Sequence, residues 1–244
     1  MGSKPTDTAT YQLHPLGDSA VVIQFGNTID PEVNRRIRAI TSYLNCHTFS
    51  GFRELVPAYT TITVYYDPWV VSKKGQVDPY QKVVEHLQRR LVNAPASDAT
   101  QHYIVVEIPV CYGNNFGPDL EYVAAHNKLT TEKVIRLHAE GEYQVYMIGF
   151  APGFPYLGGL NPKIATPRKQ TPRAIIPAGS VGIAGMQTGI YPMETPGGWQ
   201  LIGRTPLTLF NPEQMRPSLL QAGNIVKFIP ISESEFAQRK DPAR

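Results

Sequence analysis

The chain is poor in cysteine, and this scarcity excludes two kinds of site. Cys46 and Cys111 are the only cysteines in 244 residues, and neither belongs to a CxxC or CxxH motif. A disulfide framework or a structural zinc site requires more cysteines at closer spacing. We therefore expect both cysteines to be reduced and buried, as in a cytoplasmic protein, and we expect no metal site.

Several other features are missing as well. The net charge is only +3, and no basic run alternates with aromatic residues, so nucleic acid is not an expected partner. The sequence has no GxxxxGK[ST] phosphate loop, no GxSxG or HExxH motif, and no biotin-acceptor lysine between methionines. Its longest uncharged stretches, residues 143–162 and 174–193, are interrupted by proline and glycine, so we expect no membrane span.

Glycine and proline, in contrast, are concentrated in one segment. Residues 149–206 hold 11 of the 20 glycines and 9 of the 22 prolines. Glycine permits positive φ and proline fixes φ, so this density predicts short strands and tight turns, not helices. Residues 143–210 contain five Lys and Arg residues but only one carboxylate, that of Glu194. This local excess of positive charge favours an anionic ligand.

The order of strand and helix signals predicts an α+β fold with two domains. Strands at 19–25, 52–57 and 61–66 and helices starting at Asp30-Pro31 and Asp78-Pro79 predict an N-terminal α+β domain over residues 1–95. The polar segment 94–101 is the best linker candidate. Short, closely spaced strands then predict a β-barrel or sandwich over residues 96–244.

Polar side chains on the turns of the glycine- and proline-rich segment are the candidate site. Arginine presents a planar fork of donors that suits a carboxylate or phosphate, and glutamine suits an amide or lactam. None of these residues is an obvious nucleophile or strong base, which predicts a site completed by another protein. The candidate substrate-binding residues are Tyr146, Arg168, Arg173, Gln187, Tyr191, Pro196, Gln200 and Arg204.

Two further groups of residues leave alternatives open. His138 precedes the turn into this segment, and a structural role is favoured over a catalytic one. The rings of Phe150, Phe154, Tyr156 and Trp199 could serve as exposed anchors for a partner. Filling the barrel core is the favoured interpretation for Phe150 and Trp199.

Long strings of the sequence resemble the signature blocks of the allophanate hydrolase subunit 1 family, which includes the B subunits of 5-oxoprolinase and a sporulation kinase inhibitor. The strings are GFAPGFPYLGGL, IPAGSVGIAGMQTGIYP and TPGGWQLIGRTPL, with LGDSAVVIQFG and IPVCYGNNFGPDL nearer the N-terminus. The resemblance spans roughly residues 11–235. It implies that the second domain is a cyclophilin-like β-barrel, although a fold does not carry its function with it.

The resemblance also implies an activity and partners. The implied reaction is the opening of 5-oxo-L-proline to L-glutamate coupled to ATP hydrolysis, with ATP as a co-substrate of the complex. The implied partners are a subunit 2-like protein (the C subunit) and a LamB/YcsF-type protein (the A subunit), and the chain alone is expected to be inactive. The alternative is a regulatory protein that binds a sporulation histidine kinase and inhibits its autophosphorylation.

Overall fold

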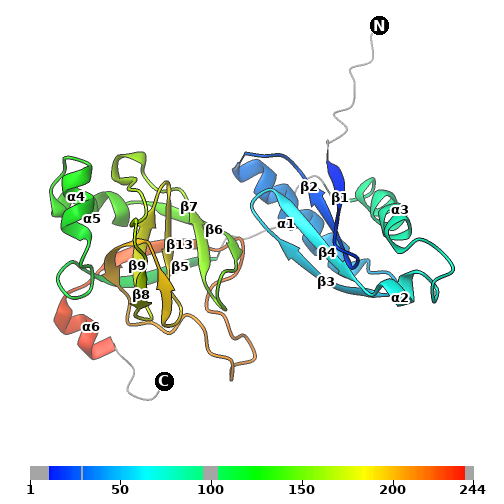
Figure 1. The fold of residues 1–244 in the computed structure, drawn as a ribbon. Helices are drawn as coiled ribbons and strands as arrows, with labels where there is room; N and C mark the ends of the chain where they lie inside the picture. The colour runs from blue at the N-terminus through cyan, green and yellow to red at the C-terminus, as the bar shows by residue number, and fades with distance from the viewer. Residues whose placement is uncertain (1–10, 29, 96–103, 240–244) are drawn as a thin grey trace, which may run out of the picture. The chain divides into compact units, whose positions relative to one another are not determined.

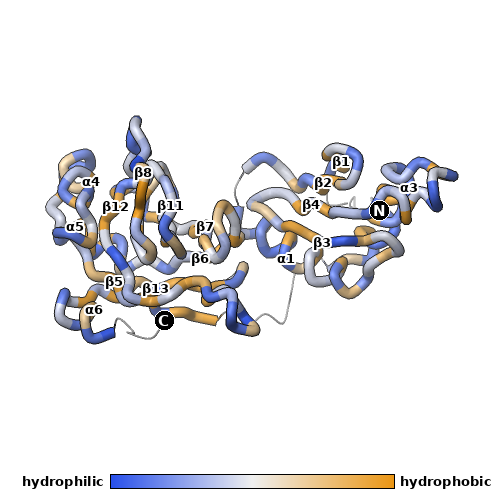
Figure 2. The backbone as a smooth tube through the Cα atoms, turned by 60° about the horizontal axis from the view of Figure 1, so that its bottom comes forward, coloured by the Kyte–Doolittle hydropathy of each residue, from blue (hydrophilic) through white to orange (hydrophobic). Residues whose placement is uncertain are grey.

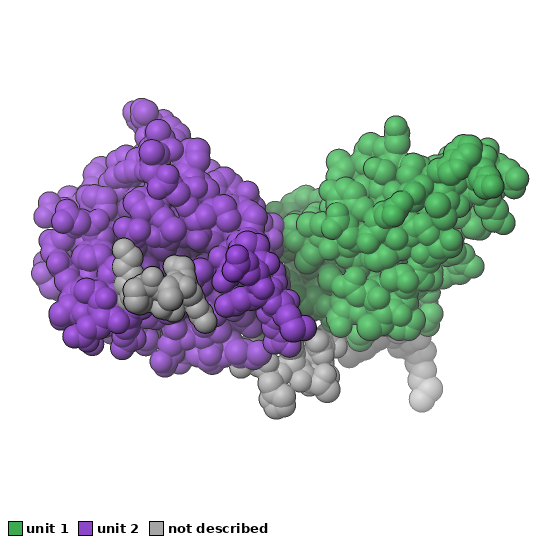
Figure 3. Space-filling model, turned by 90° about the horizontal axis from the view of Figure 1, so that it is seen from below, with its two compact units in different colours: residues 1–101 green, residues 102–244 purple. Residues whose placement is uncertain are grey.

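A computed structural model describes residues 11–28, 30–95 and 104–239 of the chain, which divides into two compact units (Figures 1 and 3). Unit 1 comprises residues 1–101 and unit 2 comprises residues 102–244. The domain boundary predicted between residues 95 and 96 adjoins segment 96–103, which is outside the described residues, so this boundary stays a prediction. In the described ranges, no helix is long and apolar enough to cross a membrane.

Unit 1 is an antiparallel sheet with strand order β1-β2-β4-β3 and helices packed on it. Its elements are β1 (Gln12–Leu16), β2 (Ala20–Gln24), α1 (Pro31–Cys46), β3 (Phe52–Pro57), β4 (Thr61–Tyr66), α2 (Pro68–Val71) and α3 (Pro79–Leu91). Val21 and Ile23 of β2 are buried in one cluster with Ile37 of α1 and Leu87 of α3. Because residues two apart on a strand share a face, both helices cover the same face of the sheet.

The two main helices of unit 1 begin where the sequence predicts. The Asp30 carboxylate accepts a hydrogen bond from the Glu32 N–H at 2.7 Å, and the Asp78 carboxylate accepts one from the Gln81 N–H at 3.1 Å. Each aspartate is followed by a proline at the first helical position. Strand β1 was not predicted.

Unit 2 is a closed seven-stranded barrel in the order β10-β7-β6-β13-β5-β12-β9, with β9 paired to β10, and a separate β8–β11 pair. Its elements are β5 (Val105–Tyr112), α4 (Leu120–His126), α5 (Thr131–Ala139), β6 (Glu142–Ile148), β7 (Pro155–Gly158), η1 (Pro162–Ile164), β8 (Arg173–Ile176), β9 (Ser180–Ala184), β10 (Gln187–Ile190), β11 (Thr195–Gly197), β12 (Gln200–Arg204), β13 (Ile225–Pro230) and α6 (Glu233–Arg239). The predicted fold class, an α+β domain followed by a β-barrel, is confirmed.

The barrel has its own hydrophobic core. Strands β5 and β13 carry hydrophobic stretches in Figure 2 and run parallel to each other, pairing Ile108 with Phe228. Both side chains are fully buried. Both cysteines are free, as predicted, and Cys111 on β5 is buried; the prediction that Cys46 is buried was wrong, because it is exposed at the last position of α1.

Candidate ligand-binding site

The loop before α4 runs beside β12 and carries an aspartate to that strand. The Gly113 N–H donates to the Ile202 carbonyl at 3.1 Å, and the Asp119 N–H donates to the Leu201 carbonyl at 2.9 Å. A Cβ at Gly117 would lie 2.0 Å from the Ile202 carbonyl oxygen, so only glycine permits this close approach. The loop therefore fixes Asp119 against β12.

The Asp119 carboxylate is the electrostatic centre of this region. Although Asp119 directly precedes α4, its side chain does not cap the helix. Its Oδ1 instead accepts hydrogen bonds from Arg173 Nη2 at 2.7 Å and Lys169 Nζ at 3.3 Å, and its Oδ2 accepts one from the Leu201 N–H at 2.7 Å. Burial raises the pKa of Asp119, but the bonds from Arg173 and Leu201 outweigh this effect and the pKa is lowered. Asp119 is therefore ionised, and both of its carboxylate oxygens accept hydrogen bonds within the fold.

Segment 167–171 is held against the start of β12. The Lys169 N–H donates to the Gly198 carbonyl at 2.7 Å, and Gln200 Nε2 donates to the Pro167 carbonyl at 2.9 Å. Between these two anchors, the Arg168 guanidinium carbon lies 5.9 Å from the centre of the Trp199 ring. These two hydrogen bonds hold the Arg168 guanidinium close to the Trp199 ring.

Arg168 lines two pockets. The first, which we call the aromatic pocket, is lined by Phe150, Phe154, Tyr156, Arg168, Tyr191, Pro196, Gly197, Gly198 and Trp199. The second, which we call the polar pocket, is lined by Asp119, Tyr122, Pro167, Arg168, Lys169, Gln170, Thr171 and Gln200.

The aromatic pocket is built around Phe154. The Phe154 ring meets those of Tyr156, Tyr191 and Trp199 edge to face, with centroids 5.1, 5.4 and 5.6 Å away. Such pairs are favourable beyond the area that they bury. Burial raises the pKa of Tyr191 to about 12, so its hydroxyl stays protonated near neutral pH. This pocket offers flat apolar walls with one cation, that of Arg168.

Phe150 is held over this pocket in a strained backbone conformation. Its φ is +66°, and the Ala151 N–H donates to the Gly149 carbonyl at 2.8 Å, which defines a γ-turn centred on Phe150. A positive φ is unfavourable for a bulky residue, and strain of this kind gathers at functional sites. The expectation that Phe150 fills the core was wrong, because it is 65% exposed, whereas Trp199 is buried as expected.

The polar pocket has a positive balance of charge. Asp119 is its one acidic residue in the described ranges, Arg168 and Lys169 are basic, and Arg173 is bonded to Asp119. Two buried atoms, Oε1 of Gln200, which lines this pocket, and Nη1 of Arg173, have no hydrogen-bond partner among the described residues. This pocket therefore favours an anionic ligand that also carries hydrogen-bonding groups.

The structure brings together five of the eight predicted site residues. Arg168, Tyr191 and Pro196 line the aromatic pocket, Gln200 lines the polar pocket, and Arg173 is bonded to Asp119. These five residues do not line one pocket: four are divided between the two pockets that share Arg168, and Arg173 lines neither.

The other three predicted residues, like Arg173, line neither pocket, and they are not bonded to Asp119 either. The Tyr146 ring is buried against Gly158, where a Cβ would come within 1.8 Å of it. Gln187 begins β10, and the Arg204 Nε donates to the Ala178 carbonyl at 2.9 Å. Asp119 was missed as a site residue: its Gly-Pro-Asp context predicts a helix start, and its partners lie up to 82 positions away.

His138 has the structural role that the sequence favours. It is fully buried, with Nδ1 2.7 Å from the Tyr112 hydroxyl and Nε2 2.9 Å from Thr188 Oγ1. Because Thr188 Oγ1 donates to the Gly182 carbonyl at 3.0 Å, Nε2 donates to Thr188 and Nδ1 accepts from Tyr112. Burial lowers the pKa of His138 to about 3. The imidazole is neutral and all its bonds are used within the fold.

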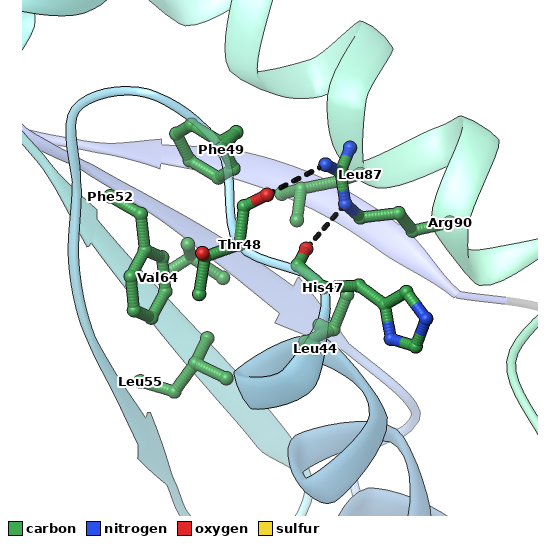
Figure 4. Close-up of a pocket in the computed structure, with 9 residues that line it drawn as sticks. All are labelled: Leu44, His47, Thr48, Phe49, Phe52, Leu55, Val64, Leu87 and Arg90. Carbon is green, nitrogen blue, oxygen red and sulfur yellow. Dashed lines mark hydrogen bonds between the residues drawn. The ribbon is translucent and has the colours of Figure 1, made fainter.

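Unit 1 contains an apolar pocket that also has a structural role (Figure 4). Its walls include Leu44, Phe49, Phe52 and Leu87, and Arg90 reaches it from α3. Arg90 Nε donates to the His47 carbonyl at 2.5 Å, and Nη2 donates to the Thr48 carbonyl at 2.9 Å. The guanidinium closes the end of α1, where carbonyls lack helical partners.

Comparison with known proteins places the chain in a family. Residues 11–220 match the family described as carboxyltransferase domain, subdomain C and D. The B subunit of 5-oxoprolinase from Bacillus subtilis is 52% identical over 237 residues, which cover 96% of this chain and 98% of the relative. The protein of the same name from Haemophilus influenzae is 43% identical, covering 88% and 95%. The chain belongs to this family, and its close relatives are B subunits of 5-oxoprolinase.

Solved structures agree with this fold. TTHA0988 is 36% identical with a TM-score of 0.75, and the match covers 87% of this chain but 40% of that one. The urea amidolyase of K. lactis has a TM-score of 0.75 at 19% identity, covering 98% of this chain and 16% of that one. The second likeness extends to the fold alone.

Proposed function

We propose that this chain is the B subunit of a 5-oxoprolinase that opens 5-oxo-L-proline to L-glutamate coupled to ATP hydrolysis. The observation that carries the proposal is the high identity, over nearly their whole length, to relatives that bear this name. In the reaction, water adds to the lactam carbonyl and the C–N bond breaks, while ATP hydrolysis supplies the driving force.

The two pockets support a binding role for this chain. The substrate is a small anion with a flat lactam ring, and Arg168 supplies a charge suited to its carboxylate. The substrate-binding groups that we propose are Arg168, Arg173, Tyr191, Pro196 and Gln200, together with Asp119, which holds Arg173. A binding role for Tyr146, Gln187 and Arg204 has no support from the geometry.

We assign catalysis and ATP binding to partner subunits. Among the described residues, no group of three or more His, Cys, Asp or Glu side chains could hold a metal ion. His138 is enclosed in a chain of hydrogen bonds, and the sequence has no phosphate loop. We propose that a subunit 2-like C subunit and a LamB/YcsF-type A subunit complete the site and that ATP binds within that complex. Inhibition of a sporulation histidine kinase stays a prediction, since nothing in the described part of the chain favours it.

Reconstitution tests this proposal. The purified chain should release no glutamate from 5-oxoproline and ATP, and activity should appear when the A and C subunits are added. In that complex, Arg168→Ala should lower kcat/KM roughly 10- to 100-fold, because it removes a charge-assisted contact. Arg216→Ala is the matched control, since Arg216 is an exposed arginine of the same unit that lines neither pocket. Turnover by the isolated chain, or equal activity of both variants, would contradict the proposal.

A further inference from the structure

The aromatic pocket is open to a ligand through residues that solvent reaches. In its lining, the rings of Phe154 and Trp199 are buried, whereas Phe150, Arg168 and Pro196 are exposed. The exposed Phe150 ring meets the Phe154 ring edge to face, with centroids 5.3 Å apart. A ligand can therefore reach one aromatic ring and one cation at this pocket.

The loop around Phe150 holds its ring at this position. The Gly149 N–H donates to the Phe154 carbonyl at 3.1 Å, and the Phe154 N–H donates to the Ala151 carbonyl at 3.0 Å. These bonds close residues 149–154 into one turn and keep Phe150 at its positive φ. Because the ring is exposed, burial offsets little of this backbone strain, and such strain favours a binding role for the ring.

Arg168 carries a charge that no carboxylate offsets. Lys169 and Arg173, in contrast, both bond the Asp119 carboxylate, at 3.3 and 2.7 Å. Arg168 lies against the Trp199 ring but makes no hydrogen bond or ion pair in residues 11–28, 30–95 and 104–239. No acidic residue of these ranges lines the aromatic pocket. An unpaired planar guanidinium beside apolar rings suits the carboxylate of a ligand.

We infer that the aromatic pocket binds a small ring that carries a carboxylate, with the ring against Phe150 and the carboxylate on the Arg168 guanidinium. The faces of the ring then contact aromatic side chains, and the charge-assisted bonds form at the residue that both pockets share. Phe150 selects for the ring and Arg168 for the charge, so both are specificity-determining residues. The identity of the ligand as 5-oxoproline rests on the proposed function.

Two fragments of 5-oxo-L-proline separate the contribution of the ring from that of the carboxylate. 2-Pyrrolidone is the lactam ring without the carboxylate, and acetate is a carboxylate without the ring. A hydrogen bond to a charged group contributes roughly a factor of 10 to 100 in affinity. The full chain should therefore bind 5-oxo-L-proline at least about tenfold more tightly than either fragment.

NMR titrations of the full chain, without partners or ATP, measure these affinities and locate the ring. Both 5-oxo-L-proline and 2-pyrrolidone should shift the backbone amide signals of Phe150 and Gly197, which line only the aromatic pocket. The neutral ring alone should leave the signals of Gln170 and Thr171 unchanged, because these residues line only the polar pocket.

Three variants assign the contacts to side chains. Arg168→Met removes the charge and keeps an apolar stem, so it should weaken 5-oxo-L-proline about tenfold and leave 2-pyrrolidone unchanged. Phe150→Ala removes the ring and should weaken both compounds about threefold or more. Arg216→Met is the matched control for the lost charge, since Arg216 is exposed and lines neither pocket, and it should bind like the unmodified chain.

The outcomes separate this inference from the proposed function. Equal affinity for the three compounds, no saturable response, or shifts at Gln170 and Thr171 in place of Phe150 and Gly197 overturns the inference, even if the reconstituted complex turns over 5-oxoproline. A preference for 5-oxo-L-proline that survives in Arg168→Met also overturns it. A preference that is lost in Arg168→Met and kept in the control supports it even if the complex proves inactive, in which case the proposed function alone fails.

Discussion

Lowering the pH should destabilise unit 2 through His138. The imidazole is fully buried and neutral, and its pKa is lowered to about 3 from a value of 6.5 for an exposed histidine. Between these two values the unfolded chain binds one more proton than the folded chain. The free energy of unfolding therefore falls as the pH falls from 6.5 toward 3, by about 1.4 kcal/mol per pH unit. Because the unfolded imidazole is only half protonated at pH 6.5, the loss between pH 6.5 and 4.5 is about 2 kcal/mol.

Urea unfolding curves at several pH values measure this loss. Trp199 is buried in the same unit, and the chain has two tryptophans, so a Trp69→Phe background makes the fluorescence report on unit 2. The comparison variant is His138→Gln, which does not titrate but can still bond Tyr112 or Thr188. The other histidines are common to both proteins, and working above pH 4.5 keeps Asp119 ionised, because its pKa is lowered from 3.8.

The variant should be less stable than the parent at pH 7, and the two curves should converge as the pH falls. The reason is that only the parent must keep its imidazole unprotonated in the folded state. If the two proteins lose stability with parallel slopes from pH 6.5 to 4.5, the imidazole is not held neutral, and the chain of bonds from Tyr112 to Gly182 is wrong.

Three further substitutions test the architecture of the site. Phe150→Gly should be more stable than Phe150→Ala by about 1 kcal/mol in urea unfolding, because φ at this position is +66°; equal stabilities would contradict the strain. Asp119→Asn should lower the free energy of unfolding by about 2 kcal/mol, because it leaves two partly buried cations unpaired; a neutral effect would mean that the ion pairs are solvated. Gly117→Ala should lower it by about 1–3 kcal/mol, because the new Cβ meets the Ile202 carbonyl; unchanged stability would show that the loop can move away from β12.

Local signals in the sequence predicted much of the fold. The Asp-Pro pairs at Asp30 and Asp78 specify helix starts through contacts within three residues, and they begin helices as expected. The glycine- and proline-rich segment forms the predicted short strands and turns. Strand β1 was missed because its sequence, QLHPL, has little β-branched character and contains Pro15, which only an edge strand tolerates.

The site was predictable only in part because its main contacts are distant in sequence. Arg173 and Asp119 are 54 positions apart, and the Leu201 N–H is 82 positions from the carboxylate that it bonds. The spacing of residues in the sequence cannot show that such residues are neighbours, because only the closure of the barrel brings them together. Composition did indicate the basic side chains and Gln200, but it could not assign them to two pockets. The Phe-Ala-Pro-Gly context does not specify the positive φ of Phe150 or the exposure of its ring.

The electrostatics of the pockets explain why this chain should bind substrate and not act on it alone. A general acid or base works best with a pKa close to the working pH. At the pockets, the pKa of the Asp119 carboxyl is lowered and that of the Tyr191 hydroxyl is raised to about 12, so both move away from neutrality. Each group is fixed in one protonation state, which suits a residue that holds a ligand or another side chain. Under the proposed function, we therefore expect the proton transfers of ring opening to use groups that the partner proteins bring to the site.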